Sequence, residues 1–206
     1  MKKLIVPAFI SLDGVIQAPG GPDEDRSNGF AHGGWIWPYA DASGEVMGGV
    51  FSHPFELLLG RRTYDIFAAH WPHVPKGAPH QGIADLFNGT TKHVATHHPD
   101  TLAWQNSRAL GPDIASAVRE LKRGDGTNLV TQGSSELAHQ LLATDLVDEL
   151  RLLVYPILLG RGKRLFDERT QASAFRLETS KTLSTGVLVN RYVRAGEVQS
   201  GSFESA

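Results

Sequence analysis

The sequence contains no cysteine among its 206 residues. This absence excludes disulfide bonds, thiolate zinc sites and catalysis by a cysteine nucleophile. It suits a reducing compartment, so we expect a cytoplasmic protein. Recognisable metal-ligand spacing is also missing, because the nine histidines form no H-E-x-x-H or similar pattern. We therefore expect no bound metal.

The sequence also lacks a large excess of charge of one sign, and it lacks a long apolar run. The chain has 20 basic and 22 acidic residues, whereas a nucleic-acid or membrane-surface partner requires a concentration of charge of one sign. No stretch approaches the roughly 20 apolar residues of a membrane helix. The opening MKKLIVPAFISLDG is not a typical signal peptide, because Pro7 interrupts its apolar run and Ser11 ends it. We expect neither a nucleic-acid partner nor a membrane partner.

The pattern that is present is an alternation of short apolar strands with helices. Strands are expected at residues 2–10, 55–59, 91–96, 101–107, 128–131, 150–159, 175–183 and 186–194, and helices at 38–51, 62–69, 80–87, 112–122 and 134–142. This order predicts an α/β three-layer sandwich with a mostly parallel central sheet and an antiparallel C-terminal hairpin. We expect one domain over residues 1–194 and a flexible tail over 195–206.

The stretch LLLGRRTYD (57–65) ends an apolar strand with residues that suit an anion. Gly60 permits a turn, and Arg61, Arg62 and Thr63 begin the next predicted helix. The first turn of a helix exposes unpaired backbone N–H groups, and the helix dipole favours negative charge there. An equally open interpretation is a plain strand-to-helix turn with solvated charges.

The stretch QGSSELAHQLL (132–142) has a similar design. Gly133 allows close backbone approach, and Ser134 or Ser135 can cap the following helix. A glycine and two serines at a helix N-terminus form a second candidate anion nest. The alternative is an ordinary capped helix, and neither stretch matches the G-x-G-x-x-G or G-x-x-x-x-G-K-[ST] fingerprints.

Taken in order, several segments resemble the dihydrofolate reductase-like superfamily, and most closely the stand-alone relatives of the reductase domain in bifunctional riboflavin-pathway deaminase-reductases. These segments are AFISLDGVI (8–16), LLLGRRTYD (57–65), QGSSELAHQLL (132–142), LVDELRLLVYPILLGRGKRLF (146–166) and the loop DEDRSNGFAHGGWIWPYAD (23–41). The resemblance implies an NADPH-dependent reductase that transfers hydride to a small planar heterocycle, pyrimidine- or pterin-like, or to its ribosylamine.

The resemblance also implies which residues hold the cofactor. They are Ser11, Gly14, Gly60, Arg61, Arg62, Thr63, Thr96, Gly133, Ser134 and Ser135. In the family's Gly-Arg-x-Thr pattern, Arg61 meets the 2′-phosphate side of NADPH and Thr63 meets the pyrophosphate. A charge-assisted hydrogen bond contributes about 1.5–3 kcal/mol, so Arg61 is expected to favour NADPH over NADH by roughly 10- to 150-fold.

Candidates for the chemical step are fewer. Asp13 and Gln132 are the catalytic candidates, although an Asp before a Gly is common in turns and Gln132 cannot titrate. Glu45 lies about where dihydrofolate reductases keep a pterin-binding carboxylate, with a solvated helix charge as the alternative. His32 and Trp35, in the long loop at 17–37, are expected to contact a planar substrate. The alternative is that the tryptophans of this loop fix it to the core.

Two departures from the family pattern bear on the substrate. Val15 stands where the riboflavin-pathway reductases usually have Lys or Arg, and Gln132 stands where they often have Glu. Besides a reductase, two other interpretations therefore stay open: a dinucleotide-binding module that has lost its chemistry and acts as a sensor or assembly partner, and a plain nucleotide-phosphate binder. The very apolar strand at 150–159 is expected to be central or buried in a dimer, and the resemblance favours a homodimer.

Overall fold

The computed structural model describes residues 1–39, 51 and 53–203. The predicted helix at 38–51 therefore falls largely outside the described residues, and so does the substrate candidate Glu45. Within the described part, a short 3₁₀ turn (η2) covers Trp37–Tyr39.

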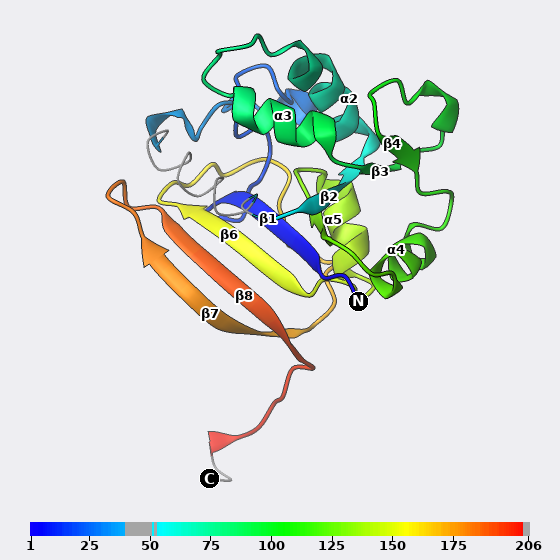
Figure 1. Ribbon diagram of the computed structural model, residues 1–206. Helices are drawn as coiled ribbons and strands as arrows, with labels where there is room; N and C mark the ends of the chain where they lie inside the picture. Colours follow the sequence, from blue (N-terminus) through cyan, green and yellow to red (C-terminus); the bar gives the residue numbers. More distant parts are fainter. Residues whose placement is uncertain (40–50, 52, 204–206) are drawn as a thin grey trace.

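The architecture is an eight-stranded sheet with helices on both faces (Figure 1). The strands are β1 (Leu4–Ser11), β2 (Phe55–Gly60), β3 (Lys92–Ala95), β4 (Ser107–Ala109), β5 (Asn128–Thr131), β6 (Glu149–Tyr155), β7 (Ala174–Thr182) and β8 (Leu188–Gly196). Their order is β4-β3-β2-β5-β1-β6-β8-β7, parallel from β4 to β6 and antiparallel between β6, β8 and β7. This confirms the predicted fold class.

The helices are α2 (Arg61–His70), α3 (Gln81–Gly89), α4 (Ile114–Arg123) and α5 (Ser135–Leu142). The strands of the sheet separate two cores because alternate side chains point to opposite faces. In β2, Leu57 and Leu59 pack with Tyr64 of α2 and Phe87 of α3, whereas Leu58 packs with the side chains of α4 and α5. The predicted three layers follow from this alternation.

Strand β6 is central, as its apolar sequence predicted, because it pairs with β1 on one side and β8 on the other. It ends at Tyr155, four residues before the predicted end. Pro156 comes next and has no backbone N–H to continue the ladder. The chain turns there, and the Ile157 N–H donates to the Tyr155 carbonyl at 2.7 Å.

The strand predicted at 101–107 is wrong in position. The structure has a 3₁₀ turn (η4) at Pro99–Thr101, and β4 begins only at Ser107. The segment between them is held by Trp104, which is 5% exposed. Its backbone N–H donates to the Tyr64 hydroxyl and its indole Nε1 donates to Asn88 Oδ1, both at 2.8 Å. These contacts to other elements replace a strand ladder.

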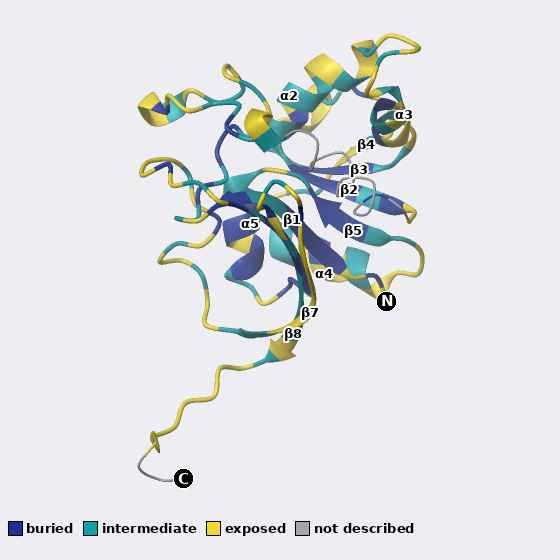
Figure 2. Cartoon of the chain, turned by 90° about the vertical axis from the view of Figure 1, so that its left-hand side faces the viewer, coloured by how far each residue is buried: buried dark blue, intermediate teal, exposed yellow. Residues whose placement is uncertain are grey.

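A third apolar cluster fixes the long loop at residues 17–37 against β6 and β8. It includes Phe30, Trp35, Leu153 and Tyr155. The far edge of the sheet is covered less: most of β7 is exposed, as Figure 2 shows in yellow, and the C-terminal segment extends away from the body of the molecule. Among the described residues, no helix has the length and apolar character needed to cross a membrane.

Candidate functional site

The two predicted anion-binding turns meet at the carboxyl ends of β2 and β5. Ser134 Oγ accepts a hydrogen bond from the Gly60 N–H at 2.8 Å and donates one to Thr63 Oγ1 at 2.8 Å. The contact is close, because a Cβ on Gly60 would lie 3.1 Å from Ser134 Oγ and a Cβ on Gly133 would lie 3.3 Å from Thr63 Oγ1. Two stretches that are about 70 residues apart in sequence therefore form one structure at the sheet edge.

Ser134 reaches this position through an unusual backbone conformation. Its φ is +62° and its ψ is +65°, in the left-handed region that L residues other than Asn and Asp rarely adopt. The serine occupies the N-cap position of α5, but its hydroxyl makes no capping bond to that helix. The expected cap of α5 is thus replaced by a bond across to the turn before α2.

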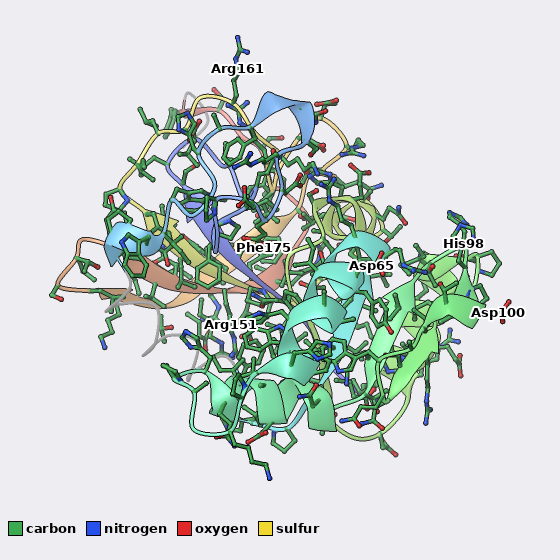
Figure 3. All side chains as sticks on the ribbon, turned by 90° about the horizontal axis from the view of Figure 1, so that it is seen from above. Asp65, His98, Asp100, Arg151, Arg161 and Phe175 are labelled. Atoms are coloured by element: carbon green, nitrogen blue, oxygen red, sulfur yellow. The ribbon has the colours of Figure 1, made fainter. Side chains whose placement is uncertain are left out.

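Arg61 lies beside this structure and reaches the end of β3. Its Nε donates to both carboxylate oxygens of Asp65, at 2.8 and 2.9 Å, and its Nη1 donates to the hydroxyls of Thr96 and Thr101 and to the His98 carbonyl. Figure 3 labels Asp65 and His98 on the same side of the molecule. Arg61 and Thr96, both predicted to contact the cofactor, are therefore in direct contact, and the Arg61 side chain keeps 31% of its surface exposed.

Arg62, the other predicted cofactor arginine, is paired with the long loop. Its Nη2 lies 2.7 Å from Asp25 Oδ1, and Lys163 Nζ lies 2.6 Å from Asp25 Oδ2. Burial raises the pKa of Asp25, but the hydrogen bonds from Lys163 and Ser27 outweigh it and lower the pKa to about 2. Asp25 therefore connects the long loop to α2 and to the segment after β6.

The Asp13 carboxylate is held by hydrogen bonds from its own turn and from the segment after β6. Its carboxylate accepts hydrogen bonds from Ser11 Oγ at 2.6 Å, from the Leu159 N–H at 3.1 Å and from the Gly160 N–H at 2.8 Å. Burial raises its pKa, but these bonds lower it to about 2. An ionised carboxylate has no proton to give near neutral pH, so Asp13 fits the turn role and not that of a proton donor. Ser11 and Gly14, predicted near the nicotinamide, belong to the same turn.

Gln132 differs from Asp13, because its side-chain oxygen is not used in a hydrogen bond to the described residues. Its Oε1 is buried and has no hydrogen-bond partner among the residues that the structure describes. A buried acceptor without a partner is costly, and a donor from a ligand or a water molecule would remove that cost. Along the sheet, Ile5 pairs with Val130 while Ser11 pairs with Tyr155, so the Ser11 turn lies beyond the end of β5. The two catalytic candidates, Asp13 and Gln132, therefore do not form one group.

The two substrate candidates of the long loop, Trp35 and His32, differ in exposure to solvent. Trp35 is 6% exposed, its Nε1 donates to the Gln17 carbonyl at 2.8 Å, and its ring meets Tyr155 edge to face. It anchors the loop, which is the alternative that the sequence left open for the tryptophans of this loop, and its role as a substrate contact stays a prediction. His32 is exposed next to Phe30. Val15 is fully buried, so its side chain does not reach a substrate.

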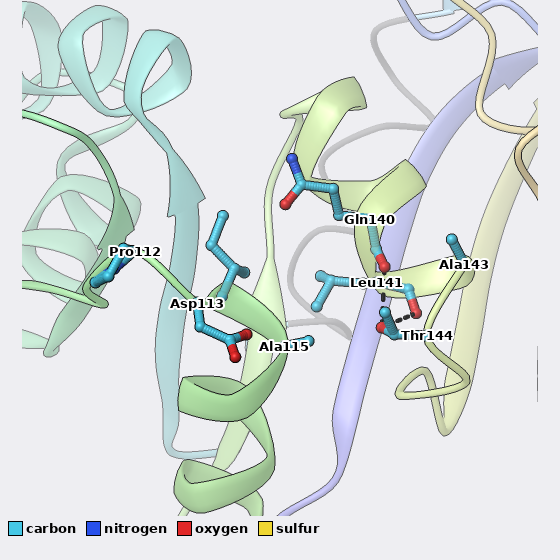
Figure 4. Close-up of a pocket in the computed structure, with 8 residues that line it drawn as sticks. Pro112, Asp113, Ala115, Gln140, Leu141, Ala143 and Thr144 are labelled. Carbon is cyan, nitrogen blue, oxygen red and sulfur yellow. Dashed lines mark hydrogen bonds between the residues drawn. The ribbon is translucent and has the colours of Figure 1, made fainter.

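A cavity of about 420 Å³ lies elsewhere, between the first turn of α4 and the last turn of α5 (Figure 4). Two of its polar side chains already have partners: Asp113 caps α4 through the Ser116 N–H, and the Thr144 hydroxyl contacts the carbonyls of Gln140 and Leu141. This cavity is therefore separate from the site at the carboxyl ends of β2 and β5. In the described ranges, no group of three or more potential metal ligands occurs.

Sequence reasoning did not identify three charged residues at this edge: Asp25, Asp65 and Lys163. Asp65 follows Arg61 by four residues, the spacing of a helical ion pair, so that contact was readable from the sequence. Asp25 and Lys163 carried no such signal, because they are 138 residues apart.

The comparisons with known proteins agree with this fold. The sequence model of the RibD C-terminal domain family matches residues 2–189. Among curated proteins, the uncharacterized protein YwjB of Bacillus subtilis (strain 168) is 24% identical over 194 residues, covering 94% of this chain and 99% of that protein. YyaP of the same strain is 26% identical over 132 residues, covering 64% and 70%.

Solved structures are similar in fold. A protein from Shewanella sp. PV-4 whose name refers to riboflavin biosynthesis superposes with a TM-score of 0.62 at 20% identity, covering 94% of this chain and 99% of the other. A pyrimidine reductase-like protein from Corynebacterium diphtheriae gives a TM-score of 0.54 at 14% identity, covering 95% and 93%. At these identities the likeness concerns the fold alone.

Proposed function

Because this chain belongs to the RibD C-terminal domain family, we propose that it is an NADPH-dependent reductase of a small planar heterocycle, pyrimidine- or pterin-like, or of its ribosylamine. The family supports a reductase-type function, and the name of one structural neighbour refers to pyrimidine reduction. One observation carries the proposal: the turns at Gly60–Thr63 and Gly133–Ser134 are bonded together beside Arg61, at the carboxyl edge of a parallel sheet. Ligands of open α/β sheets bind at this edge.

The donors present at this edge suit a dinucleotide. In this proposal the backbone N–H groups in the first turns of α2 and α5 and the Thr63 hydroxyl would hold the pyrophosphate. Arg61 and Thr96, which contact each other, would meet the 2′-phosphate, with Asp65 as the competing anion for Arg61. When bound, NADPH would supply the hydride. The protein's part is to hold the phosphates and to fix the substrate against the reactive ring.

Gln132 is the candidate for orienting that substrate. Its Oε1 is buried and unpaired among the described residues, so it is free to accept a hydrogen bond. A ring N–H or an exocyclic amine of a nitrogen heterocycle would provide the donor. An amide cannot transfer a proton at neutral pH, so Gln132 holds the substrate or a water molecule in place. His32, exposed on the long loop, is retained as a second candidate contact.

The proposal is tested by titrating the purified protein with NADPH and NADH and following intrinsic tryptophan fluorescence. We expect NADPH to bind at least tenfold more tightly than NADH, and Arg61→Ala to remove most of this difference. Arg123→Ala is the matched control, because Arg123 is exposed on α4 and pairs only with Glu120 in the described contacts. Absence of binding by either dinucleotide would refute the cofactor assignment.

A second candidate is a dinucleotide-binding module without turnover. It is favoured by the chemistry at the site, because Asp13 is held as an ionised acceptor and Gln132 does not titrate. NADPH oxidation measured with a panel of aminopyrimidine and pterin substrates separates the two candidates. Binding without oxidation of NADPH across the panel would favour the module.

We propose further that the protein acts as a cytoplasmic homodimer through the surface of β7 and β8. These strands extend beyond the helical layers (Figure 1), and Leu177 on β7 is 50% exposed. Register irregularities in β7 disfavour continuation of the sheet by edge-to-edge pairing. Packing of one β7–β8 face against its copy is therefore the expected contact.

A further inference from the structure

The cavity between α4 and α5 has room for an aromatic ring (Figure 4). Its volume is about 420 Å³, whereas a cavity of about 150 Å³ is enough to hold a benzene molecule. Five of the residues that line it have apolar side chains: Pro112, Ile114, Ala115, Leu141 and Ala143. A wall of this kind, with a few polar groups beside it, suits an aromatic side chain that is carried by a polar segment.

The C-terminal tail, residues 197–203, has such a side chain. Its sequence EVQSGSF contains two apolar residues larger than glycine, Val198 and Phe203. Val198 is 58% exposed and Phe203 is fully exposed, because the tail extends away from the body of the molecule (Figures 1 and 2). Burial of a phenylalanine removes about 150–250 Å² from water, so Phe203 is the residue of the tail that gains most from a binding site.

The tail begins beside the segment that lines the cavity. Near the end of β8, the Arg194 side chain pairs with Asp145, and the Arg194 N–H donates to the Asp148 carbonyl at 2.9 Å. Asp145 directly follows Thr144, which lines the cavity. The seven residues 197–203 span up to about 23 Å when extended, and the last turn of α5 is only about 6 Å long. The tail is therefore long enough for Phe203 to reach the cavity of its own chain.

Gly196 permits the change of direction that docking requires. Its φ is +102°, and a Cβ built on it would meet no atom within 4 Å. Glycine adopts positive and negative φ about equally well. Rotation at this last residue of β8 redirects the tail and leaves the pairing of β8 with β7 up to Arg194 in place.

We propose that the cavity between α4 and α5 is a docking site for the C-terminal tail of the same chain, with the Phe203 ring as the inserted group. The structure shows the tail in its undocked arrangement. In the docked arrangement the tail covers the last turn of α5, the helix whose first turn belongs to the candidate site.

Disulfide cross-linking tests the docking site cleanly, because the sequence has no cysteine of its own. The double variant S200C/Q140C places one thiol in the tail and the other at the cavity. The matched control is S200C/E120C, since Glu120 is exposed on α4 outside the cavity. The end of α4 is also near the start of the tail, because Lys122 Nζ lies 2.6 Å from Asp148 Oδ2.

We expect S200C/Q140C to form its disulfide within one chain roughly tenfold faster than S200C/E120C, because docking raises the effective concentration of the two thiols. Adding Phe203→Ser should reduce this rate to that of the control, whereas adding Phe203→Leu should retain most of it. Phe203 is outside the core, so these variants keep the fold, and circular dichroism verifies this.

Two results would overturn the docking site: equal rates for the two cysteine pairs, or a rate in S200C/Q140C that Phe203→Ser leaves unchanged. A disulfide that forms only between chains, seen as a dimer on a non-reducing gel with a rate that rises with protein concentration, would overturn the assignment to the tail of the same chain. The measurement involves no dinucleotide, so its outcome is independent of the proposed function.

Discussion

Replacing Asp25 with Asn tests whether the largely covered carboxylate of this residue holds the long loop in place. Asp25 is 12% exposed and accepts hydrogen bonds from Arg62, Lys163 and the Ser27 N–H. Its pKa is lowered from 3.8 to about 2, which corresponds to about 2 kcal/mol of stabilisation at neutral pH. We therefore expect Asp25→Asn to lower the free energy of unfolding by about 2 kcal/mol at pH 7.

The pH dependence follows from the same values. A carboxylate whose pKa is lower in the folded state stabilises the protein above its unfolded pKa, and this contribution is lost as the pH falls through the folded pKa. The difference between wild type and Asp25→Asn should thus be constant above about pH 4 and shrink toward pH 2. Urea denaturation, followed by tryptophan fluorescence at several pH values between 7 and 2.5, measures it.

Asp23→Asn is the matched control in the same loop. Asp23 pairs with Arg26, and both side chains are more than 70% exposed, so this variant should change stability by less than about 0.5 kcal/mol. Equal stability of Asp25→Asn and Asp23→Asn at pH 7 would refute the assigned role of Asp25. A deficit of Asp25→Asn that stays the same from pH 5 to pH 2.5 would show that charge is not its cause.

Other expected outcomes concern separate parts of the molecule. Burial lowers the pKa of Lys92 to about 8, so between about pH 8 and pH 10.5 the unfolded state binds a proton that the folded state has lost, and the wild type should gain stability as the pH rises. Lys92→Met should lack this gain when the free energy of unfolding is measured by urea denaturation across this range. The same pH dependence in wild type and Lys92→Met would contradict this expectation. Asp65→Asn should raise the affinity for NADPH up to about fivefold by freeing Arg61, with no change for NADH; an equal change for both dinucleotides would contradict the 2′-phosphate assignment. Light scattering should give twice the chain mass of 22.4 kDa, and Leu177→Lys should produce the monomer; a monomeric wild type would exclude the proposed homodimer.

Much of the fold was predictable because its determinants are local. The strands at the centre of the sheet are continuous apolar runs, as expected for strands buried on both faces. The prediction failed at residues 101–107, where the sequence permits a short strand but Trp104 bonds to Tyr64 and Asn88 instead. Those partners are 40 and 16 residues away in sequence, so local patterns cannot report them.

The candidate site, too, was only partly predictable from local sequence. Each turn carries residues that suit an anion, and that property is visible in a few consecutive letters. The partners of the charges were not visible: Arg62 was expected at the cofactor, but Asp25 approaches it from a loop 37 residues away. Trp35 was expected at the substrate, but the strand β6 provides Tyr155 as its packing partner.

Ser134 shows why a residue's type did not determine its role. At a helix N-cap, serine normally adopts an extended backbone and bonds to its own helix. Here the preceding Gly133 also has a positive φ of 58°, so the two residues turn the chain together and carry the Ser134 side chain away from α5. The hydroxyl then satisfies Gly60 at the end of β2. The bonds across the two turns offset the cost of the left-handed conformation, which for an L residue is about 1–2 kcal/mol. The strain and the interlocked turns are therefore parts of one arrangement at the carboxyl ends of β2 and β5.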